Sequence, residues 1–325
     1  MNEYASVWAL AAGCILDLLF GDPHGFPHVV VAMGRLISVL ERFLRPRFPA
    51  TPRGEARAGA LLTVLAVLAA VAVPAAVLWA LDALWFPLSF AAQCFLCFQL
   101  LAARSLRDES LKVAAALREG DVHKARHALS MIVGRDTQVL DESGIIRAAV
   151  ETVAENTSDG VIAPLLWMGL FGALGGCFFK AANTMDSMIA YKNKKYRWFG
   201  ACAAYLDDAV NFFPARLAGL LMVLAAPLCG LHGKNAWRVF RRDRLKHESP
   251  NAAHTEAACA GALGVQLGGP AVYEGRVERK AALGDALRPV EIDDIGRAHR
   301  LLFASSALAA LLALGLRAVL CALLF

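Results

Sequence analysis

The stretch LLTVLAVLAAVAVPAAVLW, residues 61–79, carries no charged side chain and decides the class of fold. A helix that crosses the hydrocarbon core of a bilayer needs about 20 mostly apolar residues, and this stretch supplies them. A second such run, residues 302–325, is interrupted only by Arg317. We therefore expect both runs to form transmembrane helices.

The composition extends this expectation to the whole chain. Of the 325 residues, 58% are hydrophobic and the mean hydropathy is +0.49, whereas a soluble domain is about 45–50% apolar. Because lipid penalises unpaired backbone polar groups, each apolar run is expected to be helical. We predict an all-α, polytopic membrane protein with helical cytoplasmic segments, forming a single domain over residues 1–325. The apolar runs fall at about 5–20, 58–86, 88–103, 161–181, 210–231 and 302–325, and the main polar segments at 104–160 and 232–300.

The net charge of +5 and the pI of about 8.8 do not indicate nucleic acid as a partner. The basic residues lie between apolar runs, where they reflect membrane topology or anionic lipid. The positive-inside rule places segments 21–57, 104–160 and 232–300 in the cytoplasm. The basic loop 181–204 would then lie outside, unless the fourth and fifth runs are re-entrant. Glycines in the fourth run permit close helix packing or such a turn, so the side of this loop stays open.

Local patterns predict further details of the fold. The first apolar run contains Asp17 and no cleavage site, so we expect a retained span and not a signal peptide. Cys94 and Cys97 lie inside an apolar run and are expected to be small buried residues, because no second cysteine pair is near. In the polar segments we expect helices near 106–117, 123–133 and 141–155, the last capped by Asp141 or Ser143, and turns at Pro250, Gly268, Gly269 and Pro270.

The first polar cluster next to an apolar run is the segment from Asp17 to Asp22, followed by His28. A carboxylate near the end of a span is costly unless it is paired or faces water. Interfacial solvation is one interpretation of Asp17. The other is that Asp17 and Asp22 together hold a cation or a phosphate-bound magnesium ion.

The second cluster follows a helical spacing. Glu151, Glu155 and Asp159 lie four residues apart and share one face of a helix, where like charges repel by a few tenths of a kcal/mol per pair. A solvated face tolerates this repulsion, and either Arg147 or a divalent cation would relieve it. These carboxylates are the best metal candidate in the sequence.

A third cluster closes the fourth apolar run. Lys180, Asn183 and Asp186 recur every three residues and line one side of a helix end. Polar groups at membrane depth indicate function by default, although a buried polar network of purely structural role is the alternative.

A fourth cluster contains the adjacent Asp207 and Asp208. Adjacent residues point in different directions on a helix, so we expect only one of them to face the site and meet Asn211. A fifth cluster, residues 248–256, precedes glycines at 261–269 that permit close backbone approach to a ligand. The sequence contains no P-loop, dinucleotide fingerprint, H-E-x-x-H or G-x-S-x-G motif.

The order and wording of these clusters resemble the CobD/CbiB family of cobalamin biosynthesis proteins, from about residue 13 to 285. The segments that carry the resemblance are LDLLFGDP (16–23), IVGRDT (132–137), VAENTSDGVIAPL (153–165), KAANTMDSM (180–188), LDDAVNFFPARL (206–217), SPNA (249–252) and GALGVQLGGP (261–270). Val29, Tyr205 and the segment 172–180 depart from the residues usual in the family, so no family role is carried to them, apart from Lys180, which also opens the matching motif 180–188.

The resemblance implies a membrane-bound, amide-forming ligase. Its acceptor is the free propionate of adenosylcobyric acid, its amine is (R)-1-aminopropan-2-ol or the O-phosphate, and its product is adenosylcobinamide or its phosphate. The resemblance also implies ATP as co-substrate and Mg²⁺. We expect a multi-pass protein of the bacterial inner membrane with its active site facing the cytoplasm. The lipid bilayer and other corrinoid-assembly enzymes are the further partners considered.

Under that resemblance the motif residues take hypothetical roles. Magnesium is held by one or two carboxylates and several waters, phosphates by cationic side chains, and corrin amides by asparagines. A carboxylate acts as general base for the amine. The metal candidates are Asp17, Asp22, Glu155, Asp159 and Asp186; the phosphate candidates Lys180, Arg135 and Arg216; the amide-binding candidates Asn156, Asn183 and Asn251; the general base Asp207 or Asp208; and Asn211 and His28 complete the binding set. Asp186, Lys180, Asp207, Asp208 and Glu155 are the residues expected to be catalytic.

Two other classes of protein fit some of these features. A transporter or channel for a small polar or corrinoid solute would explain acids and asparagines at membrane depth. However, the polar loops are long, carry as many motifs as the spans, and show no inverted repeat. A non-catalytic scaffold would not need so many acids and amides beside the spans. The sequence leaves open the phosphorylation of the amine, the activated intermediate, the span count and the oligomeric state.

Overall fold

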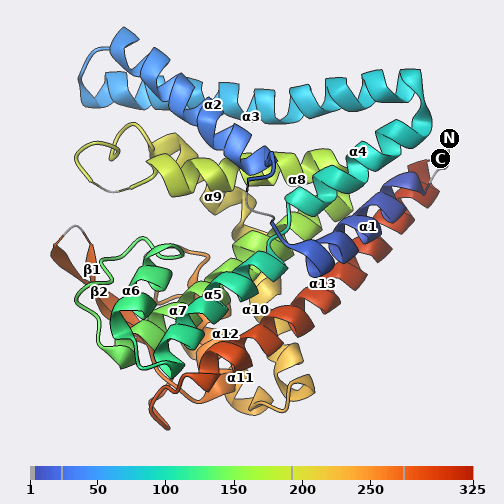
Figure 1. The fold of residues 1–325 in the computed structure, drawn as a ribbon. Coiled ribbons are helices and arrows are strands. Elements are labelled where there is room, and N and C mark those ends of the chain that lie inside the picture. The colour runs from blue at the N-terminus through green and yellow to red at the C-terminus, as the bar shows by residue number, and fades with distance from the viewer. Residues whose placement is uncertain (1–3, 23–24, 192, 274, 325) are drawn as a thin grey trace. The chain divides into compact units, whose positions relative to one another are not determined.

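A computed structural model describes residues 4–22, 25–191, 193–273 and 275–324. The chain divides into two compact units (Figure 1). Unit 1 contains Met1–Leu101, Ala163–Asn211 and Ala310–Phe325, and unit 2 contains Ala102–Ile162 and Phe212–Ala309. Each unit combines segments that are far apart in the sequence. Helices form most of both, which confirms the all-α, membrane-type fold.

Unit 1 is built from long apolar helices. Thr51 caps the longest of them by accepting a hydrogen bond from the Gly54 amide at 3.2 Å, and Pro52 opens its first turn, where a missing N–H costs nothing. Close packing of the first and fourth helices depends on Gly13, since a Cβ there would lie 2.5 Å from Cys97 Cβ. Its helices are α1 (Ala5–Phe20), α2 (Val29–Leu44) with the 3₁₀ turn η1 (Arg45–Arg47), α3 (Pro52–Leu84), α4 (Phe86–Gln99), α8 (Ala163–Ile189), α9 (Ala201–Val210) and the last turns of α13 (Asp293–Leu324).

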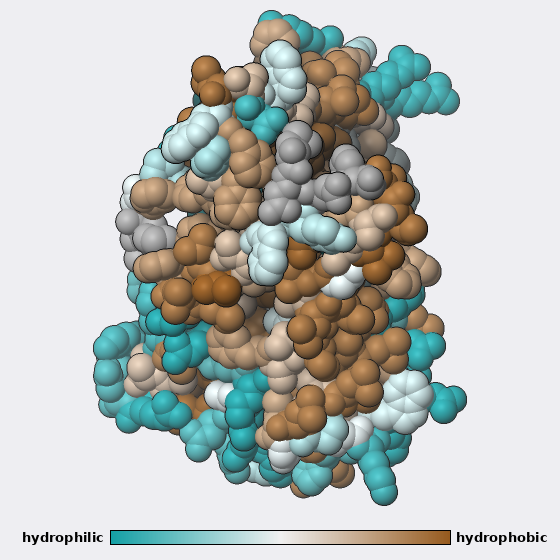
Figure 2. All heavy atoms as spheres, turned by 90° about the vertical axis from the view of Figure 1, so that its right-hand side faces the viewer, coloured by the Kyte–Doolittle hydropathy of each residue, from teal (hydrophilic) through white to brown (hydrophobic). Residues whose placement is uncertain are grey.

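The outward faces of these helices are apolar. Trp79 and Leu84 on α3 are 76% and 77% exposed, and Leu323 on α13 is 76% exposed. Figure 2 shows broad hydrophobic areas on the side where α1 and α4 lie in Figure 1. A water-facing surface rarely carries so much contiguous apolar area, so this surface faces lipid. By length and composition, Pro52–Leu84, Phe86–Arg118, Glu142–Ile189 and Asp293–Leu324 qualify as spans, and Ala201–Val210 with Phe212–Leu228 adds a fifth if the two count as one.

Helix α8 is a helical hairpin and not one straight helix. Gly172 has a φ of 64° and a ψ of −160°, which breaks the helix. The rings of Trp167 and Phe178 lie 5.0 Å apart, and a Cβ on Gly175 would lie 2.2 Å from the Trp167 carbonyl oxygen. In a straight helix those pairs would be separated by about 12–17 Å along the axis.

Arg317, the charge that interrupts the last apolar run, supports this break. Its Nη1 donates to the Leu170 carbonyl oxygen at 3.1 Å, and its Nε donates to Ser6 Oγ at 2.8 Å. The break at Gly172 removes the amide that Leu170 would otherwise meet one turn later, and the guanidinium replaces it. An arginine among lipid-exposed residues is therefore explained by a local backbone requirement.

The loop after α8 returns to the end of α2. Lys195 Nζ lies 3.5 Å from Glu41 Oε1, and the Tyr196 hydroxyl donates to Glu41 Oε2 at 3.3 Å. The Arg45 guanidinium donates to the Lys195 carbonyl and contacts the Tyr196 ring, 5.6 Å from its centroid. The loop after α8 therefore packs against the end of α2 and the turn that follows it.

Unit 2 contains the two polar segments. The helix predicted at 141–155 begins as expected, since Asp141 Oδ1 accepts from the Gly144 amide at 2.7 Å. The turns predicted at Gly268 to Pro270 are wrong, because these residues lie in a strand. Gly268 is required there, since a Cβ would lie 2.2 Å from the Ala281 carbonyl. The elements are α5 (Ala103–Arg118), α6 (Val122–Ser130), α7 (Glu142–Thr157), a π-helical stretch η2 (Ser158–Ile162), α10 (Phe212–Leu228), α11 (Gly233–Asp243), α12 (Ala253–Leu263), the antiparallel strands β1 (Leu267–Tyr273) and β2 (Arg276–Leu283), and the first part of α13.

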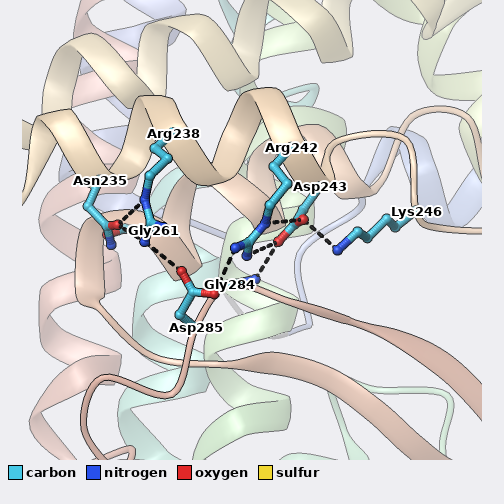
Figure 3. Close-up of polar contacts among 8 residues, drawn as sticks. All are labelled: Asn235, Arg238, Arg242, Asp243, Lys246, Gly261, Gly284 and Asp285. Atoms are coloured by element: carbon cyan, nitrogen blue, oxygen red, sulfur yellow. Dashed lines mark hydrogen bonds and ion pairs between the residues drawn. The ribbon is translucent and has the colours of Figure 1, made fainter.

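A buried ion-pair network joins α11 to the chain after β2 (Figure 3). Asp243 is fully buried and lies 2.7 Å from Arg242 and 2.6 Å from Lys246, and it accepts from the Gly284 amide at 2.9 Å. Arg242 also reaches Asp285 at 2.8 Å. The network replaces the solvation that Asp243 loses and anchors the end of the hairpin.

Candidate functional site

The loop before α2 is closed by its own motif residues. His28 Nε2 lies 3.0 Å from Asp22 Oδ1, and His28 Nδ1 accepts from the Val30 amide. His28 was expected to bind substrate, but both ring nitrogens serve this loop. Gln99, at the end of α4, accepts from the Val29 amide at 2.9 Å and donates to the Pro27 carbonyl at 2.6 Å. Gln99 thus positions the loop, a role that no sequence motif indicated.

Asp17, at the end of α1, is 2% exposed. The sequence left open whether it is solvated at the interface or held in a site. Its burial excludes simple solvation by bulk water, and it has interactions within the protein. A carboxylate placed so deeply is retained at a cost, which favours a functional or paired role.

The second arm of α8 and the helix α9 bring the third and fourth motifs together in unit 1. We call Lys180, Asn183, Asp186 and Asp207 the α8–α9 cluster. The Asn183 side chain hydrogen-bonds Asp207, and the charges of Lys180 and Asp186 act on the same carboxylate. Fold-back at Gly172 places this arm beside α9, because Phe179 and Ala182 pack with Val210 in one buried core. The cluster places a half-buried cation, amide and second carboxylate around the buried Asp207.

The prediction that only one of the adjacent aspartates faces the site is confirmed in part. Asp207 is 7% exposed, whereas Asp208 is half-buried. Asp207 meets Asn183, and its carbonyl accepts from the Asn211 amide at 2.9 Å. Asn211 itself is 1% exposed. The helical geometry of α9 therefore buries one of two adjacent aspartates and leaves the other partly exposed.

The carboxylates predicted to share one face of a helix do so in unit 2. Glu151 is 4% exposed and binds Arg135 Nη2 through Oε2 at 2.5 Å and the Gly268 amide through Oε1 at 2.7 Å. Asp136 reinforces this contact, because it accepts from the Gly275 amide at 2.8 Å. Glu151 therefore fastens the 132–137 motif and the hairpin to α7. Arg135 was expected to hold phosphate, and in this structure its guanidinium neutralises Glu151.

A wider charge cluster surrounds Glu155, one turn further along α7. Glu151 and Asp159 act on Glu155 with like charge, and Lys280 and Arg135 oppose them. Asp159 lies in the π-helical stretch η2, a form that is rare and frequent at functional sites. The like-charge repulsion predicted from the spacing is thus relieved partly by cations of the protein.

Glu256 on α12, the last residue of the polar cluster 248–256 noted in the sequence, belongs to the same group of charges. It is 6% exposed. Burial, and then the charges of Glu155 and Glu151, raise the pKa of Glu256 well above its usual value. We call Glu151, Glu155, Asp159, Glu256, Arg135 and Lys280 the α7–α12 cluster.

The remaining predicted site residues form hydrogen bonds within unit 2. Asn156 Nδ2 donates to the Thr152 carbonyl at 3.0 Å, one turn back on its own helix. Arg216 donates to the Phe212 carbonyl at 2.5 Å and to Asn251 Oδ1 at 3.4 Å. Of the glycines expected to permit close approach to a ligand, Gly261 packs against α11, since a Cβ there would lie 2.7 Å from the Asn235 carbonyl, whereas a Cβ on Gly269 would meet nothing within 4 Å.

Neither cluster forms a preassembled metal cage. Among the described residues, no three His, Cys, Asp or Glu side chains are grouped so as to hold a metal ion. Oxygen donors do occur in pairs, as Glu155 and Asp159 do on consecutive turns. Such pairs suit Mg²⁺, which takes one or two carboxylates and completes its shell with water and substrate phosphates.

Comparisons with known proteins extend over almost the whole chain. The CobD/CbiB protein family matches residues 10–302. A cobalamin biosynthesis protein CobD of Geobacter metallireducens is 50% identical over 317 residues, covering 96% of each chain. A CobD of Pelobacter propionicus is 47% identical over 311 residues, covering 96% of this chain and 95% of its own. A cobalamin biosynthesis protein CbiB of Salmonella typhi is 44% identical over 308 residues, covering 93% and 94%. No solved structure matches this chain.

Proposed function

The chain belongs to the CobD/CbiB family of cobalamin biosynthesis proteins, and from that premise we propose that it is an amide ligase of this pathway. It joins (R)-1-aminopropan-2-ol or its O-phosphate to the free propionate of adenosylcobyric acid. The product is adenosylcobinamide or its phosphate. The observation that carries the proposal is the α8–α9 cluster, which buries a carboxylate with an amide and within reach of a lysine and a second carboxylate.

The chemistry explains why such groups are needed. Forming an amide from a carboxylate and an amine in water is uphill, so the carboxylate must first be activated. We propose that a propionate oxygen attacks a phosphorus atom of ATP, and that an acyl phosphate or acyl adenylate forms as ADP or pyrophosphate leaves. The amine nitrogen then attacks the carbonyl carbon, the phosphate or AMP leaves, and the nitrogen gives up a proton.

The α8–α9 cluster supplies the proton acceptor. The amine arrives as an ammonium ion, and it is nucleophilic only after a base removes a proton. Asp207 is the proposed base, because it is buried and Asn183 orients its carboxylate. Lys180 provides positive charge next to it for the group that leaves. Asp186 of α8 is proposed as the second carboxylate of the same step. Asp208 follows Asp207 on α9.

Magnesium and phosphate have proposed ligands in both units. Bound Mg²⁺ would neutralise phosphate charge, and the oxygen donors Asp17 and Asp22 in unit 1 and Glu155 and Asp159 in unit 2 suit it chemically. Asn156, Asn183, Asn211 and Asn251 are proposed for the amide rim of the corrin, and Arg135 and Arg216 for phosphates. We further propose a location in the bacterial inner membrane, with the site on the cytoplasmic side and other corrinoid-assembly enzymes nearby.

The test uses detergent-purified protein with adenosylcobyric acid, ATP, Mg²⁺ and either amine, followed by mass spectrometry. A corrinoid heavier by one amidated amine is expected, and omission of ATP is expected to abolish it. Asp186→Asn should lose product formation while its folding and yield match those of Asp293→Asn. Asp293 is a matched control because it is 68% exposed in a surface pair with Arg118. Normal turnover by Asp186→Asn would remove this residue from the site.

Transport is the second candidate, and the broken helix α8 is the observation that favours it. Discontinuous, re-entrant helices line the substrate sites of many transporters. The discriminating assay measures corrinoid or amine flux into proteoliposomes without ATP. Flux without any amide product would replace the ligase proposal, and product without flux would exclude transport.

A further inference from the structure

A groove in unit 2 contains none of the residues proposed for the reaction. It lies between α5, the end of α10 and the first part of α13, and its volume is about 690 Å³. All of its lining residues belong to unit 2. We propose that this groove binds one anionic phospholipid of the surrounding bilayer, with the lipid phosphate at Arg107 and Arg300 and an acyl chain along α10.

Contacts between the walls form the groove without a ligand. His299 Nε2 of α13 lies 2.7 Å from Ser110 Oγ of α5, and both side chains are buried. Arg300 Nη1 donates to the Cys229 carbonyl oxygen at 3.2 Å, and Cys229 Sγ donates to the Arg300 carbonyl oxygen at 3.3 Å. Helix α13 is therefore held against both α5 and the end of α10. A ligand that enters the groove meets walls that are already in place, which lowers the entropic cost of binding.

The polar side chains of the groove give it a positive charge. Arg107 and Arg300 line it, and no carboxylate occurs among the lining residues that the structure describes. Asp108 lies 3.0 Å from Arg107 but also 2.7 Å from Arg104, so one carboxylate serves two guanidinium groups. In the described parts of the chain, no carboxylate pairs with the exposed Arg300. Guanidinium groups bind phosphate through two parallel hydrogen bonds, so an anionic headgroup complements this charge.

Apolar side chains continue from these cations. Leu111 and Phe303 line the groove together with the arginines. Leu228, on its α10 side, is 72% exposed, and Leu224 and Leu220 lie one and two turns earlier and are also exposed. The three leucines are four residues apart and form a stripe of about 12 Å along one face of α10. A soluble phosphate or a nucleotide would leave this stripe uncovered, whereas an acyl chain covers it.

The groove also lies where two apolar segments end. Helix α10 is the second part of a bent pair that qualifies as a membrane span, and it ends at Leu228. On α13, Arg300 is the last charged residue before the apolar run 302–325. Phospholipid phosphates lie at this boundary between hydrocarbon and water, and basic pockets between membrane helices bind anionic headgroups there. Position, charge and the leucine stripe therefore favour a lipid anion over a soluble one.

Native mass spectrometry of the full-length, detergent-purified protein tests the site. The titrants are phosphatidylglycerol, phosphatidylethanolamine with the same acyl chains, glycerol 3-phosphate and ATP. We expect phosphatidylglycerol to bind more tightly than phosphatidylethanolamine, and neither soluble phosphate to displace it. Arg107→Gln and Arg300→Gln should each weaken phosphatidylglycerol binding about fivefold, and the double variant about thirtyfold.

Arg118→Gln is the matched control and should bind phosphatidylglycerol as the wild type does. Arg118 lies on α5 as Arg107 does, about 16 Å further along the helix, and is 56% exposed in a surface pair with Asp293. Size-exclusion profiles equal to that of the wild type show that each variant is folded. The comparison of the two lipids on the wild type needs no variant, so it tests the site even if a substitution impairs folding.

The contrary outcomes are distinct from one another. Equal affinity of the wild type for the two lipids, or equal affinity of Arg300→Gln and Arg118→Gln for phosphatidylglycerol, would overturn the site. Displacement of phosphatidylglycerol by glycerol 3-phosphate or by ATP would assign the groove to a soluble phosphate and would overturn it as well. Because no residue of the groove belongs to the proposed reaction, failure of the lipid site leaves the ligase proposal standing, and failure of the ligase proposal leaves the lipid site standing.

Discussion

Replacing Asp243 with asparagine is expected to destabilise unit 2 by about 2–4 kcal/mol. The carboxylate is fully buried between Arg242 and Lys246, at 2.7 Å and 2.6 Å, and accepts from the Gly284 amide. Hydrogen bonds to charged groups contribute about 1.5–3 kcal/mol each when buried. However, the side chains of Arg242 and Lys246 are 40% and 44% exposed, so solvent screens each pair to about 1 kcal/mol. Most of the expected loss comes from the buried Asp243 carboxylate and its hydrogen bond from the Gly284 amide.

For a unit of this size, 1 kcal/mol corresponds to about 2–4 °C in the unfolding midpoint. A loss of about 5–12 °C is therefore expected for Asp243→Asn. Asp285→Asn is the matched control, because Asp285 belongs to the same network but is 30% exposed. It should lose no more than about 1 kcal/mol.

The same residue predicts a pH dependence. Burial alone would raise the pKa of Asp243, but hydrogen bonds from Arg242, Lys246 and the Gly284 amide hold it well below its usual range. A depressed carboxyl pKa contributes stability that is present above the unfolded value, near 3.8, and is lost as pH falls through the folded value. The wild type should therefore lose this contribution in acid, and Asp243→Asn should not.

Intrinsic tryptophan fluorescence of the detergent-purified protein, heated at pH 7 and at pH 3, measures both effects. The difference between wild type and Asp243→Asn should be largest at pH 7 and should shrink at pH 3. A variant within about 1 °C of the wild type at pH 7, or an unchanged difference at both pH values, would show that the network is not stabilising.

Three further outcomes are expected. Gly175→Val should prevent the α8 hairpin from closing, destabilise the protein by about 3 kcal/mol or more and so lower the folded yield. Gly315→Ala, whose added Cβ meets nothing within 4 Å, should leave the yield unchanged. Equal yields of the two variants on size exclusion would argue against the hairpin. Gln99→Leu should lower the thermal midpoint by an amount equal to about 2 kcal/mol, with exposed Gln266→Leu as the neutral control. Because the pKa of Glu256 is raised, its protonated form favours the folded state. The contribution of Glu256 to stability is therefore fully present below about pH 4.5 and is lost as the pH rises through the folded pKa. Glu256→Gln should flatten the dependence of the thermal midpoint on pH between pH 5 and 9, and an unchanged slope would contradict the burial argument.

Much of the candidate site was predictable because its residues stand in short motifs. The spacing of Lys180, Asn183 and Asp186 indicated a shared helix face, and helical geometry indicated that one of two adjacent aspartates would be buried. Asp207 is that residue, and it meets Asn183. Gln99 was missed, since it stands alone at the end of an apolar segment. A lone polar residue in an apolar or loop segment gives no spacing from which to infer a partner.

The sequence by itself determined the class of the protein. Uncharged runs such as residues 61–79 are long enough to cross lipid, and their backbone groups must pair within the helix, so local composition specifies membrane helices without reference to any other segment. Caps such as Thr51 and Asp141 are also local, because the acceptor and the amide lie three residues apart.

Only the tertiary structure decided where the apolar helices break and how the motifs group. Gly172 permits a reversal of the chain, but the packing of Trp167 against Phe178 and the capping of Leu170 by Arg317 show that the reversal forms. The strand at Gly268 likewise depends on its partner strand and on Glu151 from α7. These outcomes rest on contacts between residues far apart in the chain, whose free energy exceeds the local preference of either segment alone.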